Sequence, residues 1–282
     1  MTERKNILIT GCSSGIGHCV AAGLKDRGYR VIASARKEED VGSLKRQGFE
    51  SLTLDLDRSS SIDRAMERLE YLTDGRLYAL FNNGAYGQPG AVEDLSRDVL
   101  RQQFETNLFG WHELTCRVIP MMRRHGEGRI IQNSSVLGFI TLPYRGAYVA
   151  SKYALEGLSD TMRLELAGSG IHVSLIEPGP IESRFRENAH VMFNKHIDSD
   201  RSEHREYYKA MVNRLKKQGH AAPFTLPPEA VLKKVIHALE SNNPKPRYHV
   251  TFPTHLFAAL RRLLSSRALD RTLLRISGGG SR

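Results

Sequence analysis

Short apolar runs rich in β-branched residues alternate with helix-forming segments along most of this 282-residue chain. Six of these runs predict strands, at residues 6–10, 30–34, 51–54, 77–81, 128–133 and 172–176. Strand–helix–strand repetition is typical of a parallel sheet, and uninterrupted apolar strands are typical of a sheet that helices cover on both faces. The sequence therefore predicts an α/β fold, a doubly wound parallel sheet with helices on both faces.

Two segments depart from this alternation and set the expected boundaries. We expect residues 1–250 to form one sheet domain, in which the polar segment 183–228 interrupts the pattern with scattered aromatic residues and methionines. That segment is interpreted as a substrate-binding lid, with a disordered insertion as the alternative. Residues 251–282 carry leucines at helical spacing with arginines between them, which predicts a basic amphipathic helical extension.

A glycine-rich turn joins the first predicted strand to the first helix. Residues 10–17 read Thr-Gly-Cys-Ser-Ser-Gly-Ile-Gly. Glycines let the backbone turn tightly and approach a pyrophosphate closely, and the helix N-terminus supplies free N–H groups and a positive dipole end. A dinucleotide is therefore the expected ligand, with contacts from Gly11, Ser13, Ser14, Gly15, Ile16 and Gly17.

The residues after the second strand favour one dinucleotide over another. Sites that prefer NAD place an acidic residue here for the ribose 2′-hydroxyl, whereas this chain has Ala35 followed by Arg36. A guanidinium is suited to a 2′-phosphate as a bidentate partner. We therefore expect NADP(H) as the cofactor; the alternative is that Arg36 and Lys37 begin a solvated helix.

Tyr148 and Lys152 stand four residues apart in the helix expected after the fifth strand. Positions i and i+4 share a helix face, and an ammonium beside a phenol favours the phenolate and lowers the pKa of the tyrosine. Such a phenol passes a proton to a carbonyl oxygen or takes one from an alcohol. Taken alone, the pair is more often a solvated helix face, so its meaning depends on the residues around it.

In combination, these motifs resemble those of the short-chain dehydrogenase/reductase family, over residues 5–181 and more loosely to residue 250. The glycine-rich turn resembles the family's TGxxxGxG, residues 82–85 its NNAG, and residues 178–183 its PGxxxT. Ser135 precedes Tyr148 by 13 residues, the family's usual separation. The resemblance implies a Rossmann-type sheet, and it is greatest to the 17β-hydroxysteroid and retinol dehydrogenase branch, which includes uncharacterised bacterial oxidoreductases.

The resemblance also implies a role for each matching residue. Tyr148 is the general acid in reduction and the base in oxidation, and Lys152 lowers its pKa and binds the nicotinamide ribose. Ser135 donates to the substrate oxygen, and Asn107 holds a water that links Lys152 to solvent. Further cofactor contacts are implied for Asp55, Leu56, Asn82, Asn83, Gly84, Pro178, Gly179, Ile181 and Ser183.

One departure from the family pattern concerns the backbone near the cofactor. The family's Ala-Gly order is reversed to Gly84-Ala85 in this chain. If the second position requires a positive φ, Ala85 is strained there, because glycine alone visits that region freely. We still expect binding, since the catalytic hydroxyl, phenol and amine are intact.

The expected substrate is an apolar carbonyl compound, of the aldehyde, retinal or ketosteroid type. Residues 136–144, between Ser135 and Tyr148, are largely apolar and adjoin the reacting centre. Ordinary core packing is the alternative for these side chains. The leading hypothesis is an NADP-dependent carbonyl reductase acting on CH–OH groups, and a non-catalytic NADP-binding regulatory protein is the alternative.

Charge and cysteine content bear on partners and location. The net charge is +10, but half of this excess lies in residues 251–282 without interleaved aromatics, so we expect no nucleic-acid partner. The extension is interpreted either as packed on its own domain or a partner subunit, or as a peripheral contact with the inner membrane face. Three cysteines without a CxxC pair, and an N-terminus without a signal-peptide pattern, predict a cytoplasmic protein. We expect no metal ion, and a homodimer or homotetramer.

Overall fold

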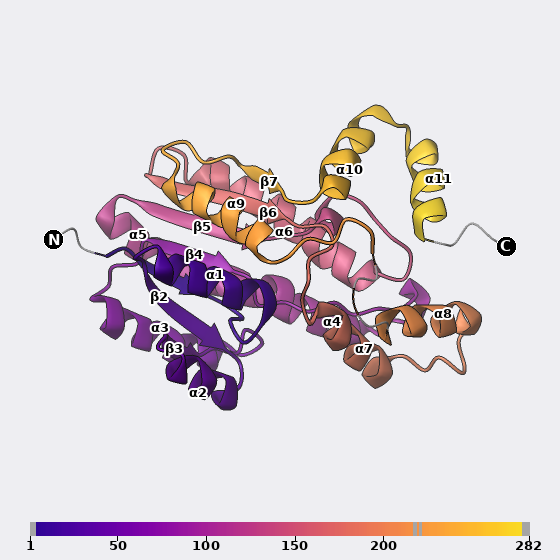
Figure 1. The fold of residues 1–282 in the computed structure, drawn as a ribbon, viewed down its shortest axis with the longest axis horizontal. Coiled ribbons are helices and arrows are strands. Elements are labelled where there is room, and N and C mark those ends of the chain that lie inside the picture. Colours follow the sequence, from indigo (N-terminus) through magenta and orange to yellow (C-terminus); the bar gives the residue numbers. More distant parts are fainter. Residues whose placement is uncertain (1–3, 217–218, 220–221, 278–282) are drawn as a thin grey trace.

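The computed structural model describes residues 4–216, 219 and 222–277. At its centre is a seven-stranded parallel sheet with the order β3-β2-β1-β4-β5-β6-β7 (Figure 1). The strands are β1 (Asn6–Ile9), β2 (Arg30–Ala35), β3 (Glu50–Thr53), β4 (Ala79–Asn82), β5 (Gly128–Asn133), β6 (Ile171–Glu177) and β7 (Arg247–His249). The order runs outward from β1 in both directions, so the predicted doubly wound parallel sheet is confirmed.

Helices cover both faces of the sheet. One face carries α1 (Gly15–Asp26), α2 (Glu38–Arg46) and α9 (Glu229–Glu240), and the other carries α3 (Ser59–Thr73), α5 (Gly110–His125) and α6 (Gly146–Glu165). Each group of helices forms its own apolar core against one side of the strands. Val20 and Leu24 pack on the first face, and Trp111 and Leu155 on the second. Sheet strands buried on both sides explain the uninterrupted apolar runs in the sequence.

The seventh strand was not among the six predicted from the sequence. Residues Arg247–His249 pair in parallel with β6, with Tyr248 opposite Ile176. The strand has three residues, and only its central Tyr248 is buried. Such a short run lacks the apolar continuity by which the other strands were found.

The helical segment before β5 has an irregular turn at its centre. Here α4 (Arg97–Phe104) and α5 are joined by a five-residue π-helix, Glu105–Phe109. Asn107 lies in this turn and is fully buried. Single π turns inside helices are frequent at functional sites, and this one places Asn107 in contact with Ser151 of α6.

The segment predicted as a lid is largely helical in its described part. It contains α7 (Phe185–His196) and α8 (Arg205–Lys216), which pack together around Phe193 and Tyr208. Residues 217–218 and 220–221 of the segment lie outside the described residues. Figure 1 shows α7 and α8 at one end of the sheet, on the same side as the C-terminal helices.

The C-terminal extension forms two helices where the sequence pattern suggested one. These are α10 (Phe252–Leu263) and α11 (Ser266–Ser277), separated where Leu264 adopts an extended conformation. Phe257 and Leu273 pack them against Phe139 and Ile140. No helix in the described part of the chain is long and apolar enough to cross a membrane.

Candidate active site

The glycine-rich turn is held against the end of β4 by contacts that exclude larger side chains. A Cβ on Gly11 would lie 2.6 Å from the Cα of Gly84, and Gly11 has a φ of +69°. A Cβ on Gly17 would lie 2.6 Å from Nδ2 of Asn83 and would overlap the carbonyl oxygen of Gly11. The turn therefore presents bare backbone at the carboxyl end of β1, where α1 begins.

The N-terminus of α1 keeps its amide groups available. Ser14 is the N-cap, but its side chain makes no capping hydrogen bond. An uncapped helix start offers N–H groups and the positive dipole end to an anion. Ser13 is exposed beside it, and the side chain of Ser183 approaches Gly15 from the opposite side, 3.1 Å from the position of a Cβ there.

Three strand ends are tied together by asparagine side chains. The Asn83 side-chain amide donates to the carbonyl oxygens of Thr10 and Gly11, at 3.0 and 3.2 Å. Its own oxygen accepts from Nδ2 of Asn133 at 2.9 Å. Asn82 instead donates inward, to Thr115 and Gln132, and is fully buried. The Asn82 side chain is thus committed to the core, whereas Asn83 braces the turn that was predicted to bind phosphate.

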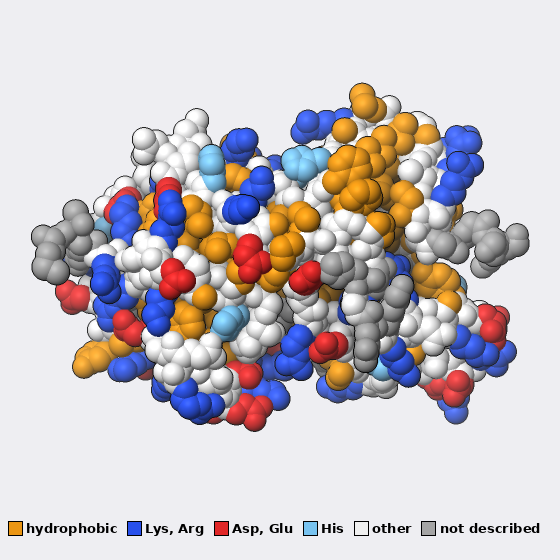
Figure 2. Space-filling model, viewed as in Figure 1, with side chains coloured by type: hydrophobic (Ala, Val, Ile, Leu, Met, Phe, Trp, Pro, Cys, Tyr) orange, Lys and Arg blue, Asp and Glu red, His pale blue; other side chains and the backbone are white. Residues whose placement is uncertain are grey.

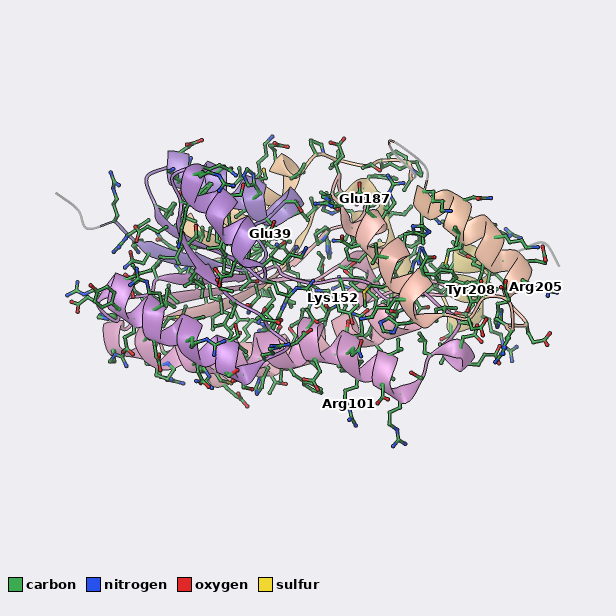
Figure 3. All side chains as sticks on the ribbon, turned by 90° about the horizontal axis from the view of Figure 1, so that it is seen from below. Glu39, Arg101, Lys152, Glu187, Arg205 and Tyr208 are labelled. Atoms are coloured by element: carbon green, nitrogen blue, oxygen red, sulfur yellow. The ribbon has the colours of Figure 1, made fainter. Side chains whose placement is uncertain are left out.

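Tyr148 and Lys152 lie on one face of α6, above the carboxyl end of β5. The ammonium of Lys152 donates to the carbonyl oxygen of Asn133 at 2.8 Å. It lies 4.2 Å from the centre of the Trp111 ring and 5.8 Å from that of Tyr148. Figure 3 shows Lys152 in the interior of the molecule, whereas Arg101 points into solvent. The predicted pair is therefore buried, and a solvated helix face is excluded.

Ser135 stands opposite Tyr148 at the start of the segment after β5. The Ser135 hydroxyl lies close enough to the phenol of Tyr148 to lower its pKa, and the Ser135 oxygen accepts the amide of Leu137 at 3.1 Å. The structure thus brings Ser135, Tyr148 and Lys152 together beside the glycine turn. A hydroxyl and a phenol aimed at one point can hold and protonate a single oxygen atom.

Burial controls the protonation of this pair. It raises the pKa of the Tyr148 phenol to about 12, and the hydrogen bond from Ser135 opposes the rise. Burial also lowers the pKa of Lys152 from 10.5 to about 7, against the nearby carboxylate of Glu156. Desolvation disfavours both charged forms, and the ammonium is directed at Asn133. The expectation that Lys152 lowers the pKa of Tyr148 stays a prediction.

Asn107 makes contacts that fix its side chain. It donates to the carbonyl oxygen of Tyr86 at 2.8 Å and to the hydroxyl of Ser151 at 3.3 Å, and it accepts the amide of Tyr86 at 3.2 Å. Ser151 is the neighbour of Lys152 on α6. These contacts put Asn107 beside the catalytic helix, while its predicted link through water stays a prediction.

The loop after β6 closes the site on the side of the C-terminal helices. The carbonyl oxygen of Pro178 accepts the amide of Val136 at 2.8 Å. A Cβ on Gly179 would overlap the hydroxyl of Thr251, so this loop lies directly on the start of α10. Ile181 pairs with Leu226, and Ser183 lies near Gly15, as noted above. The loop therefore spans from the catalytic segment to the glycine turn.

This assembly of turn, strand ends and catalytic helix coincides with a known family. The chain matches the family model described as short chain dehydrogenase over residues 5–192. The chain belongs to the short-chain dehydrogenase family. It is an oxidoreductase of that family, and the resemblance found in its sequence motifs is confirmed.

Several relatives match this short-chain dehydrogenase over nearly its whole length. It is 47% identical over 270 residues to the uncharacterized oxidoreductase YbbO of Escherichia coli (strain K12), which covers 96% of this chain and 94% of that protein. It is 32% identical to the NADPH-dependent 3-dehydrocapnine reductase of Ornithobacterium rhinotracheale, covering 94% of each. It is also 32% identical to human 17-beta-hydroxysteroid dehydrogenase type 1, covering 92% of this chain and 80% of that protein.

Solved structures have the same fold. A short-chain dehydrogenase from Streptomyces avermitilis superposes with a TM-score of 0.75 at 26% identity, covering all of both chains. One from Burkholderia cenocepacia, solved in complex with NADP, has a TM-score of 0.74 at 22% identity and covers 96% of this chain and 98% of that one. The two C-terminal helices and the lid are thus included in the matched length.

The predicted 2′-phosphate and adenine contacts lie around the end of β2 and β3. Arg36 is exposed and close enough to Asp57 to lower the pKa of that carboxyl, although burial raises it overall. Asp55 accepts the amide of Asp57 at 3.3 Å and pairs with Arg58 at 3.6 Å, so its side chain also shapes the turn. Leu56 is buried against Gly84. These residues surround the same end of the sheet as the glycine turn.

The reversed Gly84-Ala85 pair carries no backbone strain. Asp74, Tyr144 and Phe224 are the non-glycine residues with positive φ in the described part of the chain. Ala85 is absent from that group and packs half-buried in the core near α5. A Cβ on Gly84 would meet only ordinary contacts of 3.4 Å. The condition under which the reversal would weaken cofactor binding is therefore not met.

Two functional contacts were missed by the sequence reasoning. Glu156 lies one turn beyond Lys152, and its carboxylate accepts the hydroxyl of Ser134 and the Nε of Arg247. Burial and the nearby Glu177 raise the pKa of Glu156 to about 7. Trp111 packs its ring on Lys152. The spacing of four residues from Lys152 was the available signal for Glu156.

The segment predicted as a lid reaches Tyr148 through one aromatic ring. Phe185, at the start of α7, lies edge-on to Tyr148 with ring centres 5.2 Å apart. Its ring also fills the space beside Gly87, where a Cβ would be 2.6 Å from it. Phe185 is itself 37% exposed. The segment predicted as a lid therefore places a partly exposed apolar ring beside Tyr148.

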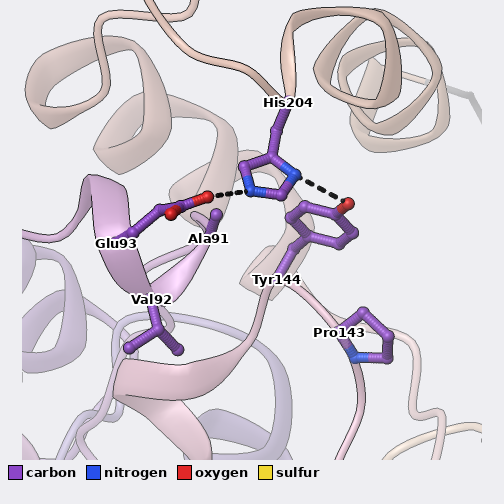
Figure 4. A pocket seen from close by; sticks show the side chains of 6 residues that line it. All are labelled: Ala91, Val92, Glu93, Pro143, Tyr144 and His204. Atoms are coloured by element: carbon purple, nitrogen blue, oxygen red, sulfur yellow. Dashed lines mark hydrogen bonds and ion pairs between the residues drawn. The ribbon is translucent and has the colours of Figure 1, made fainter.

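A second set of contacts anchors the segment predicted as a lid at a place apart from Ser135, Tyr148 and Lys152. Tyr144 stacks on Tyr207 with ring centres 3.6 Å apart, and its hydroxyl is hydrogen-bonded to His204, which also contacts Glu93 (Figure 4). The open hollow here has a volume of about 500 Å³ and does not include Tyr148 in its lining. Tyr144 has a φ of +62°, a conformation held by these contacts.

The apolar residues between Ser135 and Tyr148 pack mainly on the C-terminal helices. Phe139 and Ile140 are buried with Phe257 and Leu273, and Val136, Leu137 and Leu142 pack half-buried around them. Core packing, the alternative raised for this segment, accounts for these side chains. Phe185 is the apolar residue found in ring contact with Tyr148.

Proposed function

We propose that this protein is an NADP(H)-dependent oxidoreductase that interconverts an apolar carbonyl compound and its alcohol, working mainly as a reductase. The observation that carries the proposal is the convergence of Ser135, Tyr148 and Lys152, all buried, beside a bare-backbone turn at a helix N-terminus. An acid, a hydrogen-bond donor and a phosphate cradle at one sheet edge are the parts that hydride transfer to a carbonyl requires.

The residues of the turn fit a dinucleotide. The glycine positions at Gly11 and Gly17 leave no room for a Cβ, and the amide groups of α1 are not capped by Ser14. The exposed Arg36 is suited to the 2′-phosphate that distinguishes NADP from NAD. The cofactor is therefore NADP(H), as the name of the 3-dehydrocapnine reductase states for that relative.

The chain's own residues account for the proton in the reaction. Bound NADPH supplies the hydride. Tyr148 is protonated at neutral pH because its pKa is about 12, so its hydroxyl can donate to the carbonyl oxygen that Ser135 also holds. Lys152, with a pKa of about 7, is poised to release or take up a proton behind Tyr148. The protonated phenol is the form from which reduction starts.

An apolar substrate is supported by the mouth of the site and by several relatives. Phe185 lies against Tyr148, so a substrate carbonyl would arrive past an aromatic ring. Relatives are named for 3-ketodihydrosphingosine, 17-beta-hydroxysteroid and retinol, at 36%, 32% and 31% identity. These are large, mostly apolar compounds with one reacting oxygen, and we propose the same class of aldehyde or ketone for this enzyme.

We further propose that the enzyme acts in the cytoplasm as a homodimer or homotetramer, with peripheral contact between residues 251–282 and the inner membrane face. Exposed Leu100 on α4 and Phe109 in the π-helix supply an apolar surface for a second subunit. Apolar substrates partition into membranes, so an enzyme that uses them benefits from lying at a membrane surface.

The test is replacement of the acid. Tyr148→Phe should lower the rate of NADPH oxidation with a panel of apolar aldehydes and ketones by at least ~10²-fold, while NADPH binding, followed by its fluorescence, is kept. Tyr71→Phe, at a side chain that is 78% exposed, is the matched control and should leave turnover unchanged. Retained turnover in Tyr148→Phe would refute the role. Binding of NADPH by the wild type without any turnover would favour the non-catalytic regulator instead.

A further inference from the structure

The helix α10 has apolar side chains both toward its own domain and toward solvent. Its inner face carries Phe257, buried on Phe139 and Ile140. Its outer face carries Phe252, Leu256 and Leu263, which are 58%, 41% and 80% exposed. Since they stand four and seven residues apart, the outer residues form one stripe along the helix.

A helix that packs on its own domain needs only one apolar face. Surface helices ordinarily present polar residues to solvent on the other side, so the outer stripe is not explained by the packing of α10. Figure 2 shows hydrophobic side chains gathered over α10, with Lys and Arg at the borders of the gathering. Phe224, 58% exposed, extends the stripe through its ring contact with Phe252, with centres 5.1 Å apart. A contiguous apolar surface of this kind marks an interaction site.

The charge around the stripe selects the kind of partner. Within residues 251–277, five arginines stand against one aspartate, a net charge of +4. Arg261 lies over the ring of Tyr153, and the other four arginines are exposed: Arg262, Arg267, Arg271 and Arg275. A second copy of this chain would bring the same positive charge to the surface and be repelled. An anionic lipid surface supplies both the apolar layer and the negative charge.

The position of the stripe connects it with the proposed active site. Phe252 follows Thr251, whose hydroxyl packs on Gly179 of the loop that closes the site. The inner face of α10 rests on Phe139 and Ile140, between Ser135 and Tyr148. A surface bound through the outer stripe would therefore lie next to the mouth of the site.

We propose that Phe224 and the outer stripe of α10 dock on an anionic membrane, with the arginines of α10 and α11 on the lipid headgroups. The membrane then delivers apolar substrate to the site directly, a consequence that rests on the proposed function. The docking itself specifies the membrane contact proposed above for residues 251–282. It does not rest on the proposed catalytic activity, because it follows from exposed side chains and charge alone.

The experiment is co-sedimentation of the full chain with vesicles of phosphatidylcholine, alone or mixed with phosphatidylglycerol. The wild type should bind the mixed vesicles and release them at high salt. Leu263→Glu should weaken binding at least ~10-fold, as expected for loss of one buried leucine, and Arg267→Glu with Arg271→Glu should weaken it by a similar factor. The matched control is Leu164→Glu on α6, at a side chain 68% exposed and outside this surface, which should bind like the wild type.

Three outcomes would overturn the proposal. One is a wild type that does not bind the mixed vesicles. Another is equal binding by Leu263→Glu and Leu164→Glu. The third is a wild-type oligomer that Leu263→Glu dissociates in analytical ultracentrifugation, since the stripe would then be a subunit interface.

A soluble short-chain aldehyde separates this inference from the proposed function. The Leu263→Glu variant should oxidise NADPH with that substrate as fast as the wild type, because the replaced side chain is 80% exposed. If the wild type shows no turnover with any carbonyl yet binds anionic vesicles, the proposed function fails and the docking surface stands.

Discussion

Replacing Lys152 should make the protein more stable while it removes the proposed activity. Lys152 is 1% exposed and lies against the Trp111 ring, with the carbonyl oxygen of Asn133 as its hydrogen-bond partner. Methionine has a similar length and no charge, so Lys152→Met keeps most of the packing. The difference in stability between Lys152→Met and the wild type therefore measures the free-energy cost of burying the ammonium.

The cost follows from the pKa of the lysine. Burial lowers that pKa from 10.5 to about 7, so the charged form is disfavoured by about 5 kcal/mol below pH 7. The variant also loses the hydrogen bond to Asn133, which lowers its gain in stability by about 1.5–3 kcal/mol. We therefore expect Lys152→Met to be about 2–3 kcal/mol more stable than the wild type near pH 6.

The sign of the pH dependence is fixed by proton binding. Between about pH 7 and pH 10.5 the unfolded wild type holds a proton on this lysine that the folded protein lacks, so its stability rises with pH. The advantage of Lys152→Met should shrink by about 1.4 kcal/mol for each pH unit in that window. Near pH 9 it should have vanished.

Urea unfolding of both proteins across this pH range is the assay. Lys45→Met on α2, at an exposed lysine, is the control and should show no such trend. A Lys152→Met variant less stable than the wild type near pH 6, or a difference that stays constant with pH, would refute the reasoning that desolvation dominates at this residue.

Three further predictions concern the cofactor turn and the residues behind it. Arg36→Glu should raise the KM for NADPH by ~10–100-fold, as expected for loss of a charge-assisted pair, and leave that for NADH nearly unchanged in steady-state kinetics. Gly17→Ala should lower the free energy of unfolding by about 2 kcal/mol or more, because its Cβ overlaps the carbonyl oxygen of Gly11. Its control, Gly157→Ala, meets nothing within 4 Å and should stabilise α6 slightly in thermal unfolding. Glu156→Gln should move the alkaline limb of the kcat/KM profile to lower pH, since the lost carboxylate raises the pKa of Lys152; an unmoved limb would contradict this.

The sheet was predictable because its signal is local. Six strands were found from apolar runs that are buried on both faces, and their alternation with helices dictated parallel order. The strand Arg247–His249 was missed because it takes its shape from pairing with β6, with only Tyr248 buried. The π turn at Asn107 was missed for a related reason, since it depends on contacts with Tyr86 and Ser151 that are remote in sequence.

The convergence of the proposed catalytic residues was predictable from spacing, whereas their surroundings were not. Ser135, Tyr148 and Lys152 converge as the resemblance implied. The apolar residues of the segment 136–142, which were expected to adjoin the substrate, instead pack on α10 and α11, because these helices more than a hundred residues later cover them. No periodicity within residues 136–144 could reveal that partner. Phe185 from the lid takes the place beside Tyr148 that those residues were expected to fill.

The protonation of the site does not follow from the Tyr148–Lys152 pair alone. Spacing alone suggests a lysine ammonium that acidifies a phenol, yet burial moves the two pKa values in opposite senses, Tyr148 to about 12 and Lys152 to about 7. Both shifts favour the neutral form, so near pH 7 the phenol keeps its proton and the amine is half-charged. A protonated phenol is what reduction requires, whereas oxidation must first remove that proton against the same burial. The proton that the proposed reduction requires is therefore kept on Tyr148 by desolvation, which its neighbours in the fold impose and its neighbours in the sequence do not.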